Sequence, residues 1–167
     1  MKRDWYVLHT KPRCEKKVAL YLQRYGFFCH LPTYVKIRKV QRRKVRRVMP
    51  LFPGYVFSRL LPEERILMLQ TNYIVNTISV LYPRRLIHQL RQINKVGKKN
   101  PAELRVKAKE FKEGDYVRVV SGPFRGTEGY LAHDGSGTHL CMNVSVLGTS
   151  VMMQISPEDV EKMAPPS

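Results

Sequence analysis

Short apolar runs and helical patterns alternate along the first ninety residues of the chain. The aromatic run Trp5–Leu8 has the length of a buried strand. Pro12 suits the first turn of a helix that extends to about Tyr25, because the apolar side chains that follow recur at helical spacing. The same patterns predict strands at residues 28–31, 55–57 and 75–81, and helices that begin at Pro62 and Pro83.

A basic segment between these elements predicts a long β-hairpin. Val35 and Ile37 alternate with Lys36 and Arg38, and the tip is the polar stretch 41–44. Residues 36–47 hold eight basic residues and no acid. A disordered basic tail is the alternative, but the interleaved Val and Ile favour the hairpin.

The order of these elements predicts an α+β sandwich over residues 1–93, with helices packed on a mainly antiparallel sheet. Residues 94–110 have few large apolar side chains and are expected to be a linker. Within residues 111–163, alternation such as Leu140, Met142 and Val144 predicts four or five short strands and a small β-barrel. Residues 164–167 form a tail.

Charge separates the chain into the same two parts. The net charge is +17, but residues 1–100 hold 23 Lys and Arg against four acids, whereas residues 101–167 hold seven against nine. The first part, at +19, is expected to bind a polyanion, because cations placed on phosphates release condensed counterions. Solubility alone requires far less charge.

The absence of certain sequence features indicates the cellular compartment and argues against disulfides and zinc sites. The sequence lacks the run of about 18 apolar residues that a membrane span needs, and its N-terminus does not resemble a signal peptide. We therefore expect a cytoplasmic protein. Cys14, Cys29 and Cys141 show no CxxC spacing, so neither a disulfide nor a zinc site is expected.

A small basic nuclease is the enzyme that such a charge suggests. Metal-dependent phosphoryl chemistry needs clustered carboxylates, and the basic part offers only four acids. The five histidines show no ligand or dyad spacing, and no phosphate-binding glycine loop is present. We therefore expect no enzyme activity, no metal and no cofactor.

Several stretches resemble the NusG family of transcription factors, and together they cover nearly the whole chain in the family's order. Residues 5–18 resemble the first strand and helix of its NGN domain, and Leu51–Phe57 (LFPGYVF) resembles that domain's most recognisable segment. Residues 111–119, with Gly122, Gly126 and Gly129, resemble the KOW motif. Asp159–Lys162 matches the family's usual ending.

The resemblance implies a transcription elongation factor whose NGN domain binds the clamp helices of the largest subunit of bacterial RNA polymerase. It places Tyr55, Phe57 and Ile87 in the polymerase-binding patch. Strand alternation puts Tyr55 and Phe57 on one face, so an interface and an ordinary core both remain open. The factor is expected to suppress pausing as a monomer.

The resemblance also implies contact with the non-template DNA strand or nascent RNA. On the first helix it implicates Lys11, Arg13, Lys17 and Arg24. Tyr21 and Tyr25 either stack on exposed bases or belong to the core. The hairpin residues expected to contact DNA phosphates are Arg42, Arg43, Lys44, Arg46 and Arg47.

Within the KOW domain, Val146 and Leu147 occupy the segment implied to bind partners such as ribosomal protein S10 or Rho. Leu147 and Thr149 replace the Phe and Arg usual in the family, which weighs against those two contacts. The string Leu86–Leu90 resembles RfaH-type paralogues, which implies antitermination on a subset of operons. Interior Gly and Pro predict a permanent β-barrel. The alternative function is a ribosome-associated or general RNA-binding KOW protein.

Overall fold

The computed structural model describes residues 1–97 and 104–166 and divides into two compact units. The first unit comprises Met1–Tyr34 and Arg47–Pro83. The second comprises Val35–Arg46 and Arg84–Ser167.

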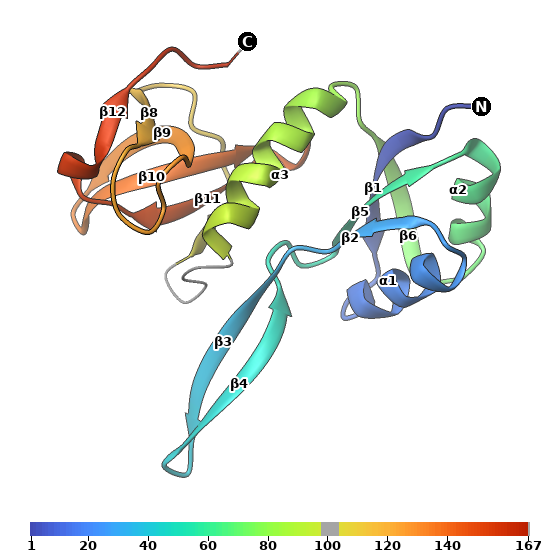
Figure 1. Cartoon of the computed structure of the whole chain (residues 1–167). Coiled ribbons are helices and arrows are strands. Elements are labelled where there is room, and N and C mark those ends of the chain that lie inside the picture. Colours follow the sequence, from blue (N-terminus) through green and yellow to red (C-terminus); the bar gives the residue numbers. More distant parts are fainter. Residues whose placement is uncertain (98–103, 167) are drawn as a thin grey trace. The chain divides into compact units, whose positions relative to one another are not determined.

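The first unit is a two-layer sandwich of a four-stranded antiparallel sheet and two helices (Figure 1). The sheet order is β2 (Phe28–His30), β5 (Tyr55–Leu60), β1 (Asp4–Thr10) and β6 (Ile74–Ser79). The helices α1 (Glu15–Arg24) and α2 (Pro62–Leu69) share one core with this sheet. Its buried residues are Leu8, Val18, Leu22, Val56, Leu60, Met68 and Ile74. The predicted α+β sandwich is confirmed.

The start of α2 shows why the helix begins where the sequence predicts. Pro62 stands in the first turn, where a helix needs no N–H donor, and Glu64 accepts a hydrogen bond from the backbone N–H of Leu61 at 2.8 Å. The same carboxylate binds the Arg3 guanidinium at 2.7 Å. Hydrogen bonding to Arg3 lowers the pKa of the Glu64 carboxyl, so the group is charged at neutral pH.

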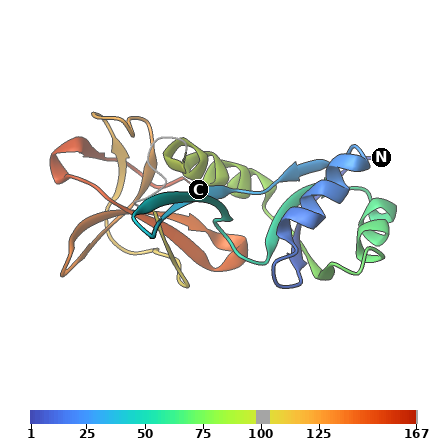
Figure 2. The same cartoon turned by 90° about the horizontal axis from the view of Figure 1, so that it is seen from below.

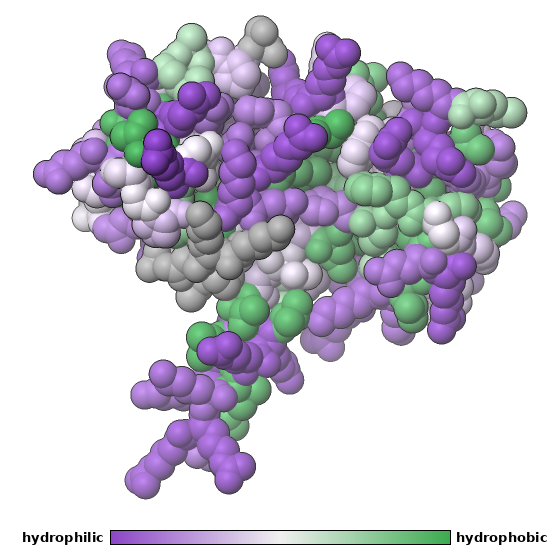
Figure 3. All heavy atoms as spheres, viewed as in Figure 1, coloured by the Kyte–Doolittle hydropathy of each residue, from purple (hydrophilic) through white to green (hydrophobic). Residues whose placement is uncertain are grey.

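The strands β3 (Thr33–Val40) and β4 (Arg43–Pro50) form the predicted hairpin as a two-stranded sheet of their own. Gln41 and Arg42 link them with φ of 47° and 67°. Positive φ at both residues is typical of a two-residue hairpin turn, because the twist of such a turn matches the twist of the two strands that it joins. Hydrophilic side chains dominate the outer part of this hairpin (Figure 3).

The second unit contains the helix α3 (Pro83–Gly97), except for its first residue, and a curved six-stranded sheet (Figure 2). The sheet order is β12 (Val160–Lys162), β8 (Tyr116–Val119), β9 (Glu128–Asp134), β10 (Gly137–Val144), β11 (Thr149–Gln154) and β7 (Arg105–Lys107). The single turns η2 (Ser145–Leu147) and η3 (Pro157–Asp159) precede β11 and β12. Val119, Leu140 and Val151 are among its fully buried residues. The predicted small β-barrel is confirmed.

Two ends of the predicted linker carry regular structure. The helix α3 continues past Asn94 to Gly97, and β7 pairs with β11. All three β7 side chains are exposed, so no alternation of apolar and polar residues marks this strand in the sequence. Residues 98–103 of the predicted linker lie outside the described residues. The domain boundaries drawn from the sequence stay a prediction.

Candidate partner and nucleic-acid interfaces

The segment Leu51–Phe57 is held in place by neighbouring elements of the first unit. Gly54 has φ of 87°, donates its N–H to the Glu15 carboxylate at 2.8 Å and accepts the N–H of Thr10 at 2.8 Å. Glu15 opens α1 and is only 7% exposed. The His9 ring stacks on Tyr55 with centroids 5.0 Å apart. This arrangement fixes the position of the half-buried Tyr55 ring.

Phe57 differs from Tyr55 in exposure, although both point to the sheet face opposite α1 and α2. Val56, between them, belongs to the core under the helices, as strand alternation predicted. Phe57 has no exposed surface. Its ring centroid lies 6.3 Å from that of Phe52 and 6.1 Å from that of His30. Burial lowers the pKa of His30, so this face carries a neutral imidazole at pH 7.

The four basic residues predicted around α1 are all exposed: Lys11, Arg13, Lys17 and Arg24. Arg13 adopts φ of 62° in the turn that leads into the helix. A fifth cation, Lys16, was not among the sequence predictions. Its Nζ donates to the backbone carbonyl of Val48 at 2.9 Å and so connects α1 to the base of β4.

The hairpin cations Arg42, Arg43, Lys44, Arg46 and Arg47 are also exposed. Within residues 1–97 and 104–166, none of them takes part in an ion pair. Their charges are therefore not neutralised by described acids of the chain, and the hairpin presents them to solvent.

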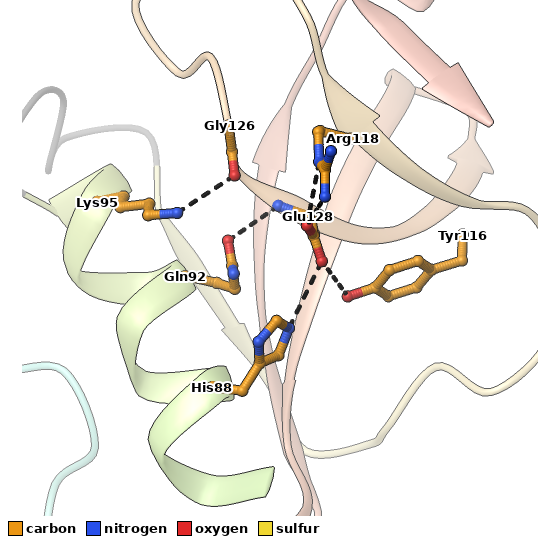
Figure 4. A network of polar contacts seen from close by, with 7 residues as sticks. All are labelled: His88, Gln92, Lys95, Tyr116, Arg118, Gly126 and Glu128. Carbon is orange, nitrogen blue, oxygen red and sulfur yellow. Dashed lines mark hydrogen bonds and ion pairs between the residues drawn. The ribbon is translucent and has the colours of Figure 1, made fainter. Parts of the chain in front are cut away.

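Polar side chains of α3 bind the barrel within the second unit (Figure 4). The buried Gln92 side chain accepts the backbone N–H of Glu128 at 3.0 Å, and Lys95 donates to the carbonyl of Gly126 at 3.3 Å. The Glu128 carboxylate also binds Arg118 at 2.7 Å and lies 3.6 Å from the His88 ring. The sequence had placed this helix with the first domain.

Gln89 extends the contact to η2. Its Nε2 donates to the Ser145 hydroxyl at 2.8 Å, and its Oε1 accepts the Ser145 N–H at 2.9 Å. The predicted partner-binding residues Val146 and Leu147 follow directly and are half-buried. Ile87, the third residue of the predicted polymerase patch, is half-buried on α3. The i, i+3 spacing of Gln89 and Gln92 was the available sign of a polar helix face.

Neither a membrane-spanning helix nor a metal cluster is found among residues 1–97 and 104–166. No helix there has the length and apolar content that a membrane crossing requires. No three His, Cys, Asp or Glu side chains gather closely enough to hold a metal ion.

Comparison with known proteins identifies the family. The family model described as "Transcription termination factor nusG" matches residues 3–110. The transcription termination/antitermination protein NusG of Thermus thermophilus is 32% identical over 148 residues, which cover 74% of this chain and 78% of that protein. The chain belongs to the NusG family of transcription termination and antitermination factors.

Other relatives cover nearly the full chain. The protein of the same description from Borreliella burgdorferi is 28% identical over 98% of this chain and 100% of its own length. The solved structure "Domain interaction in Thermotoga maritima NusG" covers 98% of this chain and 99% of its own at 26% identity, with a TM-score of 0.48.

Proposed function

We propose that this chain is a transcription elongation factor that binds bacterial RNA polymerase through its first domain, suppresses pausing and promotes antitermination. Membership of the NusG family supports the general role in transcription. The fixed position of Tyr55, between the Gly54 turn and the His9 ring, is the observation that supports polymerase attachment at this segment. A rigid aromatic ring loses little conformational entropy when it is buried at an interface.

The proposed partner is the pair of clamp helices of the polymerase largest subunit. Tyr55 is the accessible contact, and Phe57 supports the same sheet face from a fully buried position. Ile87 is proposed as a further apolar contact from α3. Because Phe57 has no exposed surface, the Tyr55 ring is expected to supply much of the binding energy at this segment.

Nucleic acid is the second proposed partner. We assign Lys11, Arg13, Lys17 and Arg24 to the non-template strand or nascent RNA. The five hairpin cations 42–44, 46 and 47 are assigned to duplex phosphates, because they are exposed and have no described acid as partner. Phosphate contacts position the factor on DNA without reading sequence.

The barrel is proposed to recruit a protein partner through Val146 and Leu147. Ribosomal protein S10 and Rho are the candidates to test, although Leu147 and Thr149 replace the family's usual Phe and Arg. The hydrogen bonds from Gln89 to Ser145 lie at the start of this segment. Retention of purified S10 or Rho by the immobilised chain, and its loss with Leu147→Asp, tests the assignment. The proposed restriction to a subset of operons is tested by occupancy across the genome of the source cell.

The decisive test measures pause escape and terminator read-through by the cognate polymerase at about 150 mM salt, where nonspecific binding is screened. Wild type is compared with Tyr55→Ala. The control is Tyr130→Ala, because Tyr130 is also half-buried and packs on a neighbouring ring, that of Tyr116 at 5.0 Å.

Wild type and Tyr130→Ala are expected to shorten pauses, whereas Tyr55→Ala should bind polymerase about 10-fold more weakly or worse, as for an interface hot spot. No change in pausing or read-through with wild type, together with intact RNA binding, would instead indicate a general RNA-binding protein.

A further inference from the structure

A cavity of about 560 Å³ lies within the second unit, between α3 and the barrel. Its volume falls in the range of small-molecule pockets, roughly 300–1,000 Å³. One wall comes from α3, with Arg84, Arg85 and His88, and the facing wall includes Glu110 and Lys112 from the segment before β8. None of the residues assigned above to polymerase, nucleic acid or a barrel partner lines this cavity, so the proposed function does not account for it.

Both walls of the cavity are held in place by side-chain amides. On β10, the Asn143 side chain accepts the N–H of Phe111 at 2.9 Å and donates to its carbonyl at 2.6 Å, which fixes the segment before β8. On α3, Gln89 binds Ser145 as described above, and Gln92 reaches the strand β9 (Figure 4). These hydrogen bonds give the cavity the defined walls of a pre-formed ligand pocket.

The charges of the lining favour an anion. The lining residues with a full charge are Arg84, Arg85, Lys112, Glu110 and Glu128. Lys112 lies 4.0 Å from Glu110, and Arg118, outside the lining, lies 2.7 Å from Glu128. Both acids therefore have cationic partners. Arg84, by contrast, is exposed and takes part in no ion pair within residues 1–97 and 104–166.

Groups that suit hydroxyls lie in the same lining. The Glu110 side chain is 17% exposed, and its separation of 4.0 Å from Lys112 is too long for a hydrogen bond, so its carboxylate is able to accept from hydroxyls. The Ser145 hydroxyl accepts from Gln89 at 2.8 Å and keeps its own hydrogen for donation. Sugar hydroxyls both donate and accept, and therefore match these two groups.

We propose that this cavity binds a phosphorylated sugar, either free or as part of a nucleoside monophosphate. Arg84 binds the phosphate, because guanidinium N–H groups match phosphate oxygens in a bidentate geometry. Glu110 and Ser145 bind hydroxyls of the sugar. The bound molecule contacts α3 and the barrel together and therefore stabilises the docked helix. The inference goes beyond the proposed function and does not rest on it.

Isothermal titration calorimetry with the full chain tests the ligand class, at about 150 mM salt to screen nonspecific anion binding. The probes are ribose 5-phosphate, AMP, adenosine and inorganic phosphate. At least one of the two phosphate esters is expected to bind, one molecule per chain, at least about 10-fold more tightly than adenosine or inorganic phosphate, each of which lacks part of the contacts. Tighter binding of AMP identifies a nucleotide site, and equal or tighter binding of ribose 5-phosphate identifies a sugar-phosphate site.

Two arginine variants of α3 separate the cavity from net charge. Arg84→Gln should weaken binding of the tighter ester roughly 10- to 100-fold, the loss expected for a hydrogen bond to a charged group. Arg91→Gln is the matched control, because Arg91 is exposed on the same helix and does not line the cavity. It removes the same charge and should bind the ester like wild type. Because both side chains are exposed, neither replacement removes core packing.

Amide hydrogen exchange provides a second readout, which nonspecific anion binding would not change. The N–H groups of Ser145 and Glu128 donate to Gln89 and Gln92 of α3, so their exchange requires the helix to leave the barrel. At 100 times its dissociation constant, the ester should slow exchange at both amides by up to about 100-fold.

The proposal is overturned if neither ester binds at one molecule per chain, or if adenosine or inorganic phosphate binds as tightly as the esters. Equal affinities of Arg84→Gln and Arg91→Gln for the ester, or unchanged exchange at both amides, would also overturn it. These outcomes are distinct from failure of the proposed function. Pause suppression is measured without added ester, so either result stands without the other.

Discussion

Individual residues carry constraints that no neighbouring residue in the chain reveals, and Gly129 in β9 is the sharpest example. A Cβ added to Gly129 would lie 2.5 Å from the backbone carbonyl oxygen of Cys141 in β10. The clash is with main chain, which cannot rotate away as a side chain can. Close approach of two backbones therefore requires glycine here, although its φ lies outside the left-handed region.

We expect Gly129→Ala to lower the free energy of unfolding of the barrel by roughly 2–3 kcal/mol through overpacking. Gly135→Ala is the matched control, because a Cβ there meets nothing within 4 Å, and it should change stability by less than about 0.5 kcal/mol. Urea unfolding followed by NMR signals of the barrel measures both. Equal midpoints for the two variants would contradict the packing argument.

At the scale of elements, α3 shows how uncharged polar side chains orient a helix that also buries apolar residues such as Leu90 and Ile93. Gln89 and Gln92 satisfy the backbone N–H groups of Ser145 and Glu128, which lie in different parts of the barrel. Buried backbone groups without partners cost free energy, so these bonds specify one orientation of the helix on the barrel.

Replacing Gln92 by Ala leaves the Glu128 N–H without its acceptor, and we expect a loss of roughly 1–3 kcal/mol. Amide hydrogen exchange should accelerate at Glu128. Faster exchange at Ser145 as well, whose acceptor Gln89 is unchanged, would show that the whole helix undocks. The exposed neighbour Arg91→Ala is the control and should leave both amides protected, and protection of Glu128 in Gln92→Ala would refute the docking.

At the scale of the whole molecule, positive charge is concentrated in the half of the chain that is proposed to bind nucleic acid. Residues 1–100 carry +19 and residues 101–167 carry −2. The exposed hairpin concentrates much of this excess in a two-stranded ribbon. Its binding to duplex DNA is therefore expected to depend steeply on salt.

Changing Arg42, Arg43 and Lys44 to Gln should reduce the slope of log affinity against log salt on duplex DNA by about 2–3, since each phosphate contact contributes about 0.9. A control with Arg105, Lys107 and Arg125 changed to Gln removes the same net charge from exposed positions in the other half. It should leave the slope nearly unchanged. Identical slopes for the two variants would show that net charge, and not the hairpin, governs binding.

Much of the fold was predictable because its signals are local. Helical spacing located α1 and its buried residues Val18 and Leu22, and strand alternation separated Val56 from Tyr55 and Phe57. The two strands of the hairpin and its positive charge could likewise be predicted from local sequence. The assignments of partner-binding and nucleic-acid-binding residues stay predictions, because the packing within the chain does not test contacts with other molecules.

The sequence by itself determined most of the elements, the α+β sandwich with its small β-barrel, the charge division and the family, but it gave no sign of β7. Only the tertiary structure decided that Phe57 is fully buried beside a half-buried Tyr55, and that α3 binds the barrel. The physical reason is that side-chain periodicity fixes a direction relative to the residue's own backbone. What lies in that direction is set by segments far away in the chain.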